Sequence, residues 1–302
     1  METTLVEIES GDEGRRLDRL LADRLGVSRA RIRYLLEVGR VQREGRALEP
    51  QAKSHRVASG ERFEVQGSLR AEDERPVARP GLDLTVAAEG SGWLIVDKPA
   101  GRGVHPLRPD QQDTVLNAVL ARHPEIEGVG EGGLRSGVVH RLDVDTSGAL
   151  VFAYDETVWR RLRGAFADHR VDKRYHALVH GHVPRERRVD LRLEITRHRP
   201  AHVEVRPDGR LCRQHVRPLR HLGDATLVEV RLETGFLHQI RASMAHLGHP
   251  VLGDLEYGAS SAPEADRPPR QMLHAHRLAF EEIAADIDWP ADFQAAIDRL
   301  AV

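Results

Sequence analysis

The residues best suited to chemistry lie in one short stretch, His140-Arg141-Leu142-Asp143-Val144-Asp145-Thr146-Ser147-Gly148. Apolar runs at 137–139 and 149–153 flank it, and each has the length and composition of a buried strand. We therefore expect a polar loop between two strands, where a rigid scaffold can position catalytic groups. Asp143 is the candidate nucleophile or base. The alternative is that Asp143 and its polar neighbours only accept hydrogen bonds within a turn.

The composition is typical of a soluble globular protein. The chain has 302 residues, of which 40% are hydrophobic and 30% are charged. No apolar run approaches the roughly 20 residues of a membrane span. The acidic start of the chain also lacks the apolar segment of a secretory signal. We therefore expect a cytoplasmic protein with no membrane partner.

The sequence favours chemistry that needs neither a metal nor an organic cofactor. The single cysteine, Cys212, allows no internal disulfide and no cysteine-based metal site. His180 and His182 could face the same side of a strand, but no third ligand follows at a recognisable interval. We therefore expect no metal site and no cofactor.

Charge separates a basic module from the rest of the chain. The net charge is −2, yet residues 15–70 contain 14 Lys or Arg against 7 Asp or Glu. Such asymmetry indicates a module that binds nucleic acid, although a solvated charged face is the more common meaning. The stretch 71–82 mixes charges with Pro and Gly and is typical of a linker. The predicted domains are an acidic segment 1–14, the basic module 15–70, this linker, and a body over 83–302.

The basic module is expected to contain two short helices and a small sheet. Leucines keep helical spacing from Arg15 to Gly26, and a second helix begins after the cap residue Ser28 and ends at Gly39. This pattern, RLDRLLADRLGVSRARIRYLLEVGRV, resembles the S-four RNA-binding fold. The resemblance implies that four arginines contact RNA phosphates: Arg29, Arg31, Arg33 and Arg40.

The body is predicted to have an α+β fold, with a mixed, mainly antiparallel sheet and flanking helices. Strands and turns outnumber helices, and most neighbouring strands are joined by short turns. The expected strands lie at 84–87, 93–96, 175–179, within 189–232, and at 273–280. The expected helices lie from about 113, at 157–167, at 238–247, and after Pro290, with a Ser/Pro-rich loop over 260–270.

Three stretches of the body resemble the RluA-type pseudouridine synthase family, which isomerises uridine in ribosomal or transfer RNA. They are the loop HRLDVDTSG, the segment KRYHALV at 173–179, and the segment TGFLHQIR at 234–241. The similarity extends over residues 84–295 through VDKPAG and LGHPVLGDLEYG. With the S-four-like module, the layout resembles that of the RluC and RluD type of large-subunit ribosomal RNA enzymes.

The resemblance implies roles for particular residues. Asp143 is the residue that acts on the substrate while uracil leaves C1′ of the ribose and rejoins it through C5. Three routes stay open: addition of the carboxylate to C6 of the base, addition to C1′ of the sugar, and assistance of an elimination. Arg241 is the matching residue that would keep this carboxylate charged. Tyr175 offers the base a flat face, although a strand tyrosine is more often a plain core residue. Substrate contacts are also implied for Arg141, for which a salt bridge to Asp145 is the alternative, and for Leu273, His140 and Thr146.

One motif departs from the family pattern, because Phe236 and Leu237 stand where members usually have Arg and Thr. This difference supports one alternative, an RNA-binding protein of ribosome assembly with impaired turnover. A glycosidase is another, but its second carboxylate would have to be Asp145. The leading hypothesis is a monomeric RNA pseudouridine synthase that acts on structured RNA, large-subunit ribosomal RNA in preference to transfer RNA.

Overall fold

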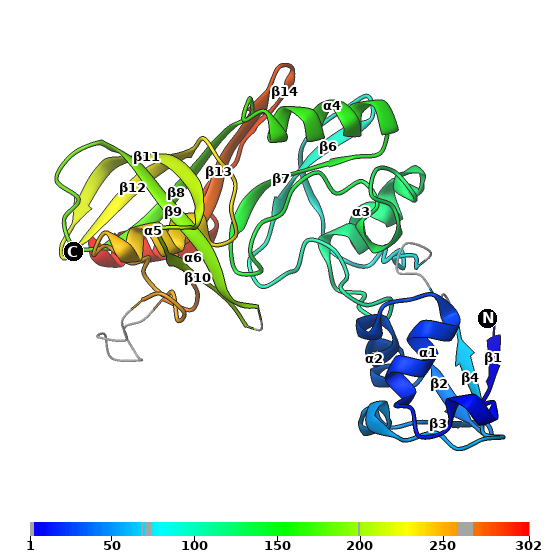
Figure 1. Cartoon of the computed structure of the whole chain (residues 1–302). Helices are drawn as coiled ribbons and strands as arrows, with labels where there is room; N and C mark the ends of the chain where they lie inside the picture. Colours follow the sequence, from blue (N-terminus) through cyan, green and yellow to red (C-terminus); the bar gives the residue numbers. More distant parts are fainter. Residues whose placement is uncertain (1–2, 68, 70–73, 199, 259–267, 302) are drawn as a thin grey trace. The chain divides into compact units, whose positions relative to one another are not determined.

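The computed structural model describes residues 3–67, 69, 74–198, 200–258 and 268–301. The chain divides into two compact units, Met1–Arg75 with Gly132–Leu134, and Pro76–Glu131 with Arg135–Val302 (Figure 1). Residues 71–73 of the predicted linker and most of the predicted Ser/Pro-rich loop lie outside the described residues.

The first unit packs two helices against a small sheet. Helices α1 (Leu17–Leu25) and α2 (Arg29–Glu37) bury their leucine and isoleucine faces together, as the spacing predicts. Gly26 ends α1 in the left-handed conformation, and the Ser28 hydroxyl caps α2 by accepting the backbone N–H of Arg31 at 3.1 Å. The sheet order is β1-β4-β2-β3, with bounds Thr3–Glu7, Arg62–Gln66, Val41–Arg43 and Arg46–Ala47. The acidic start of the chain therefore supplies a strand that pairs with β4.

In the second unit, the described residues form a ten-stranded sheet in the order β10-β9-β11-β12-β8-β13-β7-β6-β5, with β14 paired to β13. The one parallel pairing within it joins β13 to β7. This mainly antiparallel α+β architecture agrees with the predicted fold class. In chain order, β5 to β14 are Thr85–Gly90, Trp93–Lys98, Ser147–Ala153, Asp172–His180, Arg187–His198, Ala201–Val205, Arg210–Leu222, Ala225–Leu232, Leu273–Phe280 and Ile283–Asp286.

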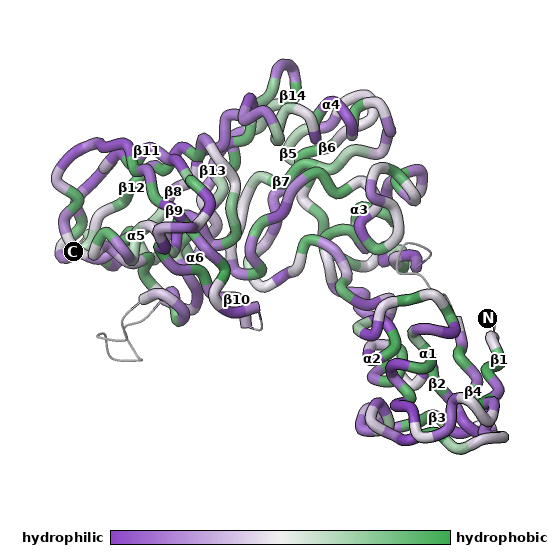
Figure 2. The backbone as a smooth tube through the Cα atoms, viewed as in Figure 1, coloured by the Kyte–Doolittle hydropathy of each residue, from purple (hydrophilic) through white to green (hydrophobic). Residues whose placement is uncertain are grey.

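Strand β13 joins two halves of this sheet. One half contains β5, β6 and β7 with helices α3 (Val115–Arg122) and α4 (Glu156–Ala167). The other half contains β8 to β12 with α5 (Gln239–His246) and α6 (Ala291–Leu300). The apolar stretches of β6 and β7 show as green segments of the tube in Figure 2, and these strands are almost fully buried. One apolar core runs from β6 and β7 to β8 and β12, so the two halves share their packing.

The run at 137–139 is not the strand that its composition predicts. It forms only an isolated bridge, from Val138 to Phe152 of β7. Side chains of α4 donate hydrogen bonds to two of its carbonyl groups. Trp159 Nε1 donates to the carbonyl of Val138 at 3.1 Å, and Arg163 donates to the carbonyl of Val139 at 2.8 Å. The polar loop is consequently held by a strand on one side and by a helix-bound segment on the other.

No helix in the part of the chain that the structure describes is both long enough and apolar enough to cross a membrane.

Candidate active site

The polar loop 140–146 is fixed on one side by a buried lysine. Lys98 ends β6, and its ammonium donates to the carbonyls of Pro99 at 2.8 Å, Arg102 at 2.7 Å and Val144 at 2.7 Å. Burial favours the neutral amine and lowers the pKa of Lys98 to about 7. The three carbonyl acceptors favour the charged form, because an ammonium group has three protons to donate. The Gly101 N–H also donates to Val144 at 2.9 Å. These bonds join the VDKPAG segment to the loop.

A second set of bonds holds the loop from the side of β13. The buried guanidinium of Arg270 donates to the carbonyl of Asp145 at 3.0 Å and forms a two-bond pair with Asp292 of α6, at 2.6 and 3.0 Å. Next to it, Gln271 Nε2 donates to the Thr146 hydroxyl at 2.9 Å. No sequence pattern predicts a role for Arg270 or Gln271. Their function in the fold is to fix the two residues of the loop, Asp145 and Thr146, that follow Asp143 and Val144.

The loop ends at a glycine that no other residue could replace without displacement of the backbone. Gly148 has φ +106°, and a Cβ added to it would lie 2.2 Å from the carbonyl oxygen of Ala275. Ala275 is its partner in the parallel pairing of β7 and β13. The glycine that closes the HRLDVDTSG motif therefore lets the two strands approach closely.

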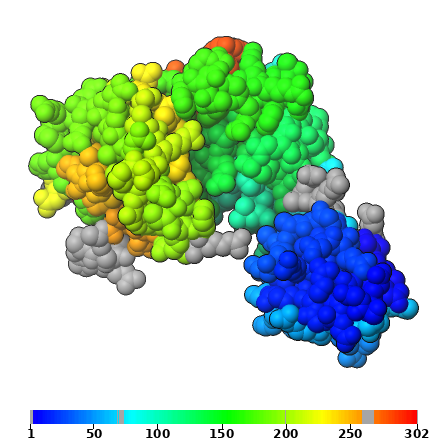
Figure 3. Space-filling view, viewed as in Figure 1, coloured from blue at the N-terminus to red at the C-terminus, as the bar shows by residue number. Residues whose placement is uncertain are grey.

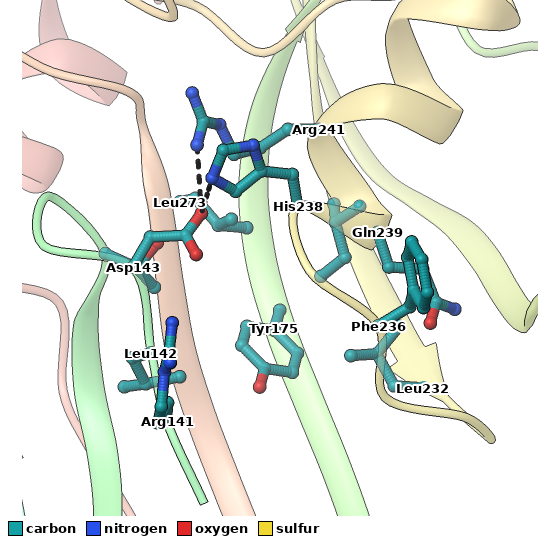
Figure 4. A pocket seen from close by; sticks show the side chains of 12 residues that line it. Arg141, Leu142, Asp143, Tyr175, Leu232, Phe236, His238, Gln239, Arg241 and Leu273 are labelled. Atoms are coloured by element: carbon teal, nitrogen blue, oxygen red, sulfur yellow. Dashed lines mark hydrogen bonds and ion pairs between the residues drawn. The ribbon is translucent and has the colours of Figure 1, made fainter. Parts of the chain in front are cut away.

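Asp143 and Arg241, far apart in sequence, form an ion pair. Nη1 of Arg241 donates to Oδ2 of Asp143 at 3.0 Å, while its Nε and Nη2 bind Asp254 at 2.6 and 2.9 Å (Figure 4). Burial alone would lower the pKa of Arg241, but the hydrogen bonds and charges of Asp254 and Asp143 raise it above its usual value. Asp254 is fully buried, and 23% of the Asp143 side chain is exposed. The Arg241 cation is thus paired with two carboxylates, the fully buried Asp254 and the more accessible Asp143.

Tyr175 and Leu273 form the floor of the site on neighbouring strands, β8 and β13. Both are more than nine-tenths buried and line the same pocket as Asp143 and Arg241. Burial and the nearby charge of Asp143 raise the pKa of Tyr175 above its usual range, so its phenol is neutral. In Figure 4, Tyr175 lies on the side of the Asp143 carboxylate where the oxygen has no dashed line to Arg241.

The pocket has about 380 Å³ of empty space and opens to solvent. It lies at the junction of the two halves of the sheet, because its walls come from the 140–146 loop on one side and from residues 232–241 on the other. In the space-filling view, the surface is hollowed where the green and the yellow parts of the second unit meet (Figure 3).

The predicted substrate contacts do not all lie in the pocket. Arg141 and Thr146 line it, and no salt bridge between Arg141 and Asp145 occurs among the described residues. His140 instead lies beneath the loop, where its ring stacks on Phe166 with a centroid distance of 4.6 Å. Burial lowers the pKa of His140 to about 3, so its ring is neutral. Its direct contact with substrate stays a prediction that this placement does not favour.

Sequence reasoning missed His238, which enters the pocket beside the ion pair. Its Nε2 lies 4.0 Å from Oδ2 of Asp143, and its Nδ1 lies 2.9 Å from the hydroxyl of Tyr257. A signal was present, since His238 precedes Arg241 by three residues at the start of α5, and such residues share a helix face.

The unusual Phe236 also lines the pocket. Its side chain is half-buried, packs against the apolar cluster of Leu193 and Ala242, and faces the site from the wall opposite the 140–146 loop. An apolar ring therefore occupies a wall where the family pattern usually has a charge, and Asp143, Tyr175 and Arg241 remain arranged around the cavity.

The four predicted RNA-contacting arginines of the first unit differ in exposure. Arg29 and Arg33 are about half exposed and lie 3.0 and 3.5 Å from the fully buried Asp18. Arg31 is only 10% exposed and pairs with the buried Glu74 at 2.6 Å, and Arg40 lies 3.6 Å from the same carboxylate, with 26% exposed. Arg29 and Arg33 are the better placed to meet an external phosphate.

Within the described ranges, no group of three or more His, Cys, Asp or Glu residues is arranged to hold a metal ion.

Comparisons with known proteins give consistent matches. A family model described as RNA pseudouridylate synthase matches residues 92–246. An uncharacterised RNA pseudouridine synthase of Synechocystis sp. is 35% identical over 95% of this chain and 89% of its own length. Ribosomal large subunit pseudouridine synthase D of Zymomonas mobilis is 33% identical over 100% of this chain and 99% of its own length. Among solved structures, human RNA pseudouridylate synthase domain containing 1 has a TM-score of 0.58 and 27% identity, covering 72% of this chain and 87% of that one.

Proposed function

Because the chain belongs to the RluA-type RNA pseudouridylate synthase family and is an isomerase of uridine in RNA, we propose that Asp143 is its nucleophile and large-subunit ribosomal RNA its substrate. The observation that supports the first part is the pocket itself. It combines a carboxylate held by one oxygen, a buried cation and a buried aromatic ring.

The reaction needs one group that stays with the reacting fragments throughout. The bond between N1 of uracil and C1′ of ribose breaks, the base turns, and a bond forms between C5 and C1′. Oδ2 of Asp143 binds Arg241, and Oδ1 points toward the side of the pocket where Tyr175 lies (Figure 4). We assign the attack to Oδ1, on either C6 or C1′, or its use as the base of an elimination.

Arg241 and Tyr175 support this carboxylate in different ways. The guanidinium of Arg241, itself 10% exposed, compensates the negative charge of Asp143, and Asp254 keeps the guanidinium in place. The neutral Tyr175 gives the uracil ring an aromatic surface on which to turn. Leu273 packs beside it and contributes no competing hydrogen bond.

Access to a uridine in structured RNA requires that the nucleotide leave its stack, which costs a few kcal/mol. Arg141 is an exposed cation at the pocket wall, two residues before Asp143. We assign to it a contact with the backbone phosphate or with the space left by the extruded base.

The choice of large-subunit ribosomal RNA has two supports. Relatives from Zymomonas mobilis and Pasteurella multocida named ribosomal large subunit pseudouridine synthase D match 99% or more of this chain at 33% and 31% identity. The S-four-like module proposed over 15–70 adds a local charge excess suited to phosphate contacts. Transfer RNA is the alternative substrate.

The test is release of tritium from RNA labelled at C5 of uracil, with ribosomal and transfer RNA from a strain that lacks this protein. We expect wild type to release tritium from large-subunit ribosomal RNA and Asp143→Asn to release none above background. Asp208→Asn, the same change at an exposed turn, is the matched control and should behave as wild type. Activity in Asp143→Asn would refute the assigned nucleophile, and release from transfer RNA alone would refute the assigned substrate.

A further inference from the structure

His238 is held in a backbone conformation that few residues adopt. It precedes α5 with φ 52° and ψ 20°, in the left-handed region, which is unfavourable for residues with a Cβ. This conformation directs the imidazole into the pocket, where 13% of the side chain is exposed. Strained backbone of this kind is often retained because it positions a functional group.

The hydrogen bonds around Tyr257 determine which nitrogen of His238 carries the proton. The Val203 N–H donates to the Tyr257 hydroxyl at 2.8 Å, and that hydroxyl lies 2.9 Å from Nδ1 of His238. Burial raises the pKa of Tyr257 to about 12, so the hydroxyl keeps a proton to donate. If Nδ1 carried the proton, both Nδ1–H and the Val203 N–H would donate to the Tyr257 oxygen. The Tyr257 hydroxyl proton would then have no acceptor at Nδ1, which is costly in a half-buried position. We therefore assign the neutral tautomer with the proton on Nε2.

The Nε2–H group faces the catalytic carboxylate. Burial lowers the pKa of His238, and the charges of Asp143, Asp254, Glu256 and Arg241 surround it with opposing effects. The neutral ring therefore presents one N–H, directed at Oδ2 of Asp143 from 4.0 Å (Figure 4). This is the same oxygen that accepts from Arg241.

We propose that His238 is a positioning residue whose Nε2–H, fixed by Tyr257, joins Arg241 in holding Oδ2 of Asp143 so that Oδ1 faces the uridine. A single donor leaves a carboxylate free to turn about its last torsion and exchange its two oxygens. A second donor from another direction fixes its plane. A distance of 4.0 Å exceeds a hydrogen bond, and we place the closed contact in the enzyme–RNA complex, where catalytic contacts shorten. The inference rests on the proposed role of Asp143.

Two substitutions at His238 separate the N–H group from the rest of the ring. The amide of Gln reaches the position of Nε2 and can donate there, whereas the amide of Asn reaches only the position of Nδ1. In single-turnover conversion of labelled RNA, we expect His238→Asn to lower the rate about 10- to 100-fold, as for loss of a positioned donor. His238→Gln should recover most of that loss, and both variants should bind RNA as wild type does. Equal rates in the two variants, whether high or low, would overturn the proposal.

The tautomer can be observed directly in the full-length protein. Long-range ¹H–¹⁵N spectra of ¹⁵N-histidine protein, with the His238 signals assigned by their loss in His238→Gln, should show the proton on Nε2. Tyr257→Phe should shift the population toward the Nδ1 tautomer and lower the single-turnover rate. A wild-type spectrum with the proton on Nδ1 would overturn the proposal.

Asp143→Asn, measured in parallel, separates this inference from the proposed function. If Asp143→Asn is inactive while Asn and Gln at position 238 behave alike, only the role of His238 fails. If Asp143→Asn converts RNA, the nucleophile assignment fails, and with it the reason for a second donor.

Discussion

At the scale of single residues, Arg241 is shared between two carboxylates with different surroundings. Asp254 is fully buried, and besides Arg241 its Oδ1 accepts the backbone N–H groups of Glu256 at 3.0 Å and Tyr257 at 3.1 Å. Among the described residues, the Asp143 carboxylate receives only Nη1 of Arg241 within hydrogen-bonding distance. Asp254 is therefore held by four donors, whereas Asp143 is held through one oxygen and its other oxygen stays open to the pocket.

This division of labour predicts the effect of Asp254→Asn. Removal of this carboxylate leaves the buried Arg241 with the partly exposed Asp143 as its counter-charge, so the free energy of unfolding should fall by about 3 kcal/mol. The guanidinium would also lose its fixed orientation toward Asp143, and kcat per folded molecule should fall about 10- to 100-fold with KM less affected. Urea denaturation and steady-state tritium release measure the two effects. Loss of stability with unchanged kcat would show that Asp254 does not orient Arg241.

The sequence motifs identified some members of this network and not others. Asp143, Tyr175 and Arg241 could be predicted because each lies in a motif that resembles a known family, and the structure brings all three to one pocket. His238 and Asp254 also lie in segments that resemble the family, TGFLHQIR and LGHPVLGDLEYG. Their contacts, however, depend on how the chain turns after α5. Hydrogen bonds between side chains 13 or 98 residues apart are not encoded in local spacing.

At the scale of elements, β8 and β13 share a group of buried histidines. His176 and His274 are partners in the pairing of these strands, and His276 stacks on His176 with a centroid distance of 4.2 Å. The Trp289 Nε1–H donates to Nδ1 of His176 at 2.8 Å, which requires that nitrogen to be unprotonated. Burial lowers the pKa of His176 to about 3 and that of His274 to about 4.

These histidines predict a loss of stability in mild acid. Their ordinary pKa is 6.5, so below that pH the unfolded chain binds protons that the folded protein does not. The free energy of unfolding should be independent of them above about pH 7 and fall by about 1.4 kcal/mol per pH unit per histidine between about pH 6 and pH 5. Urea denaturation over this range tests it. His176→Asn keeps an acceptor for Trp289 and should show a shallower slope, and an identical slope would contradict the assignment to His176.

Element prediction succeeded where the pattern is local. The spacing of apolar residues and the cap residues anticipated α1, α2, α4 and α5 to within a few residues. The run at 137–139 failed because Trp159 and Arg163 satisfy its carbonyls in place of a neighbouring strand. The position of β13 between β7 and β8 could not be predicted either, since it depends on pairing between segments that are distant in the sequence.

At the scale of the whole molecule, the charge of the first unit has an expected role in RNA affinity. Arg29→Gln with Arg33→Gln should weaken RNA binding and reduce the slope of log K against log salt by about 1.5, because two phosphate contacts are lost. Arg16 would still pair with the buried Asp18, so the unit should stay folded. Filter binding over a series of salt concentrations measures the slope. Lys53→Gln with Arg62→Gln removes the same charge elsewhere in the unit, and an equal reduction in that control would contradict a specific contact by α2.

The place of β13 in the sheet also has a consequence for the timing of biosynthesis. Strands β5 to β7 and β8 to β12 all precede β13 in the chain, so the two halves of the sheet can be joined only after the ribosome has made the segment that begins at Leu273. Leu273 is also part of the pocket floor, and Arg270 and Gln271 fix the 140–146 loop. A nascent chain therefore lacks a complete pocket until β13 has been translated, because every other residue that lines the pocket precedes this strand.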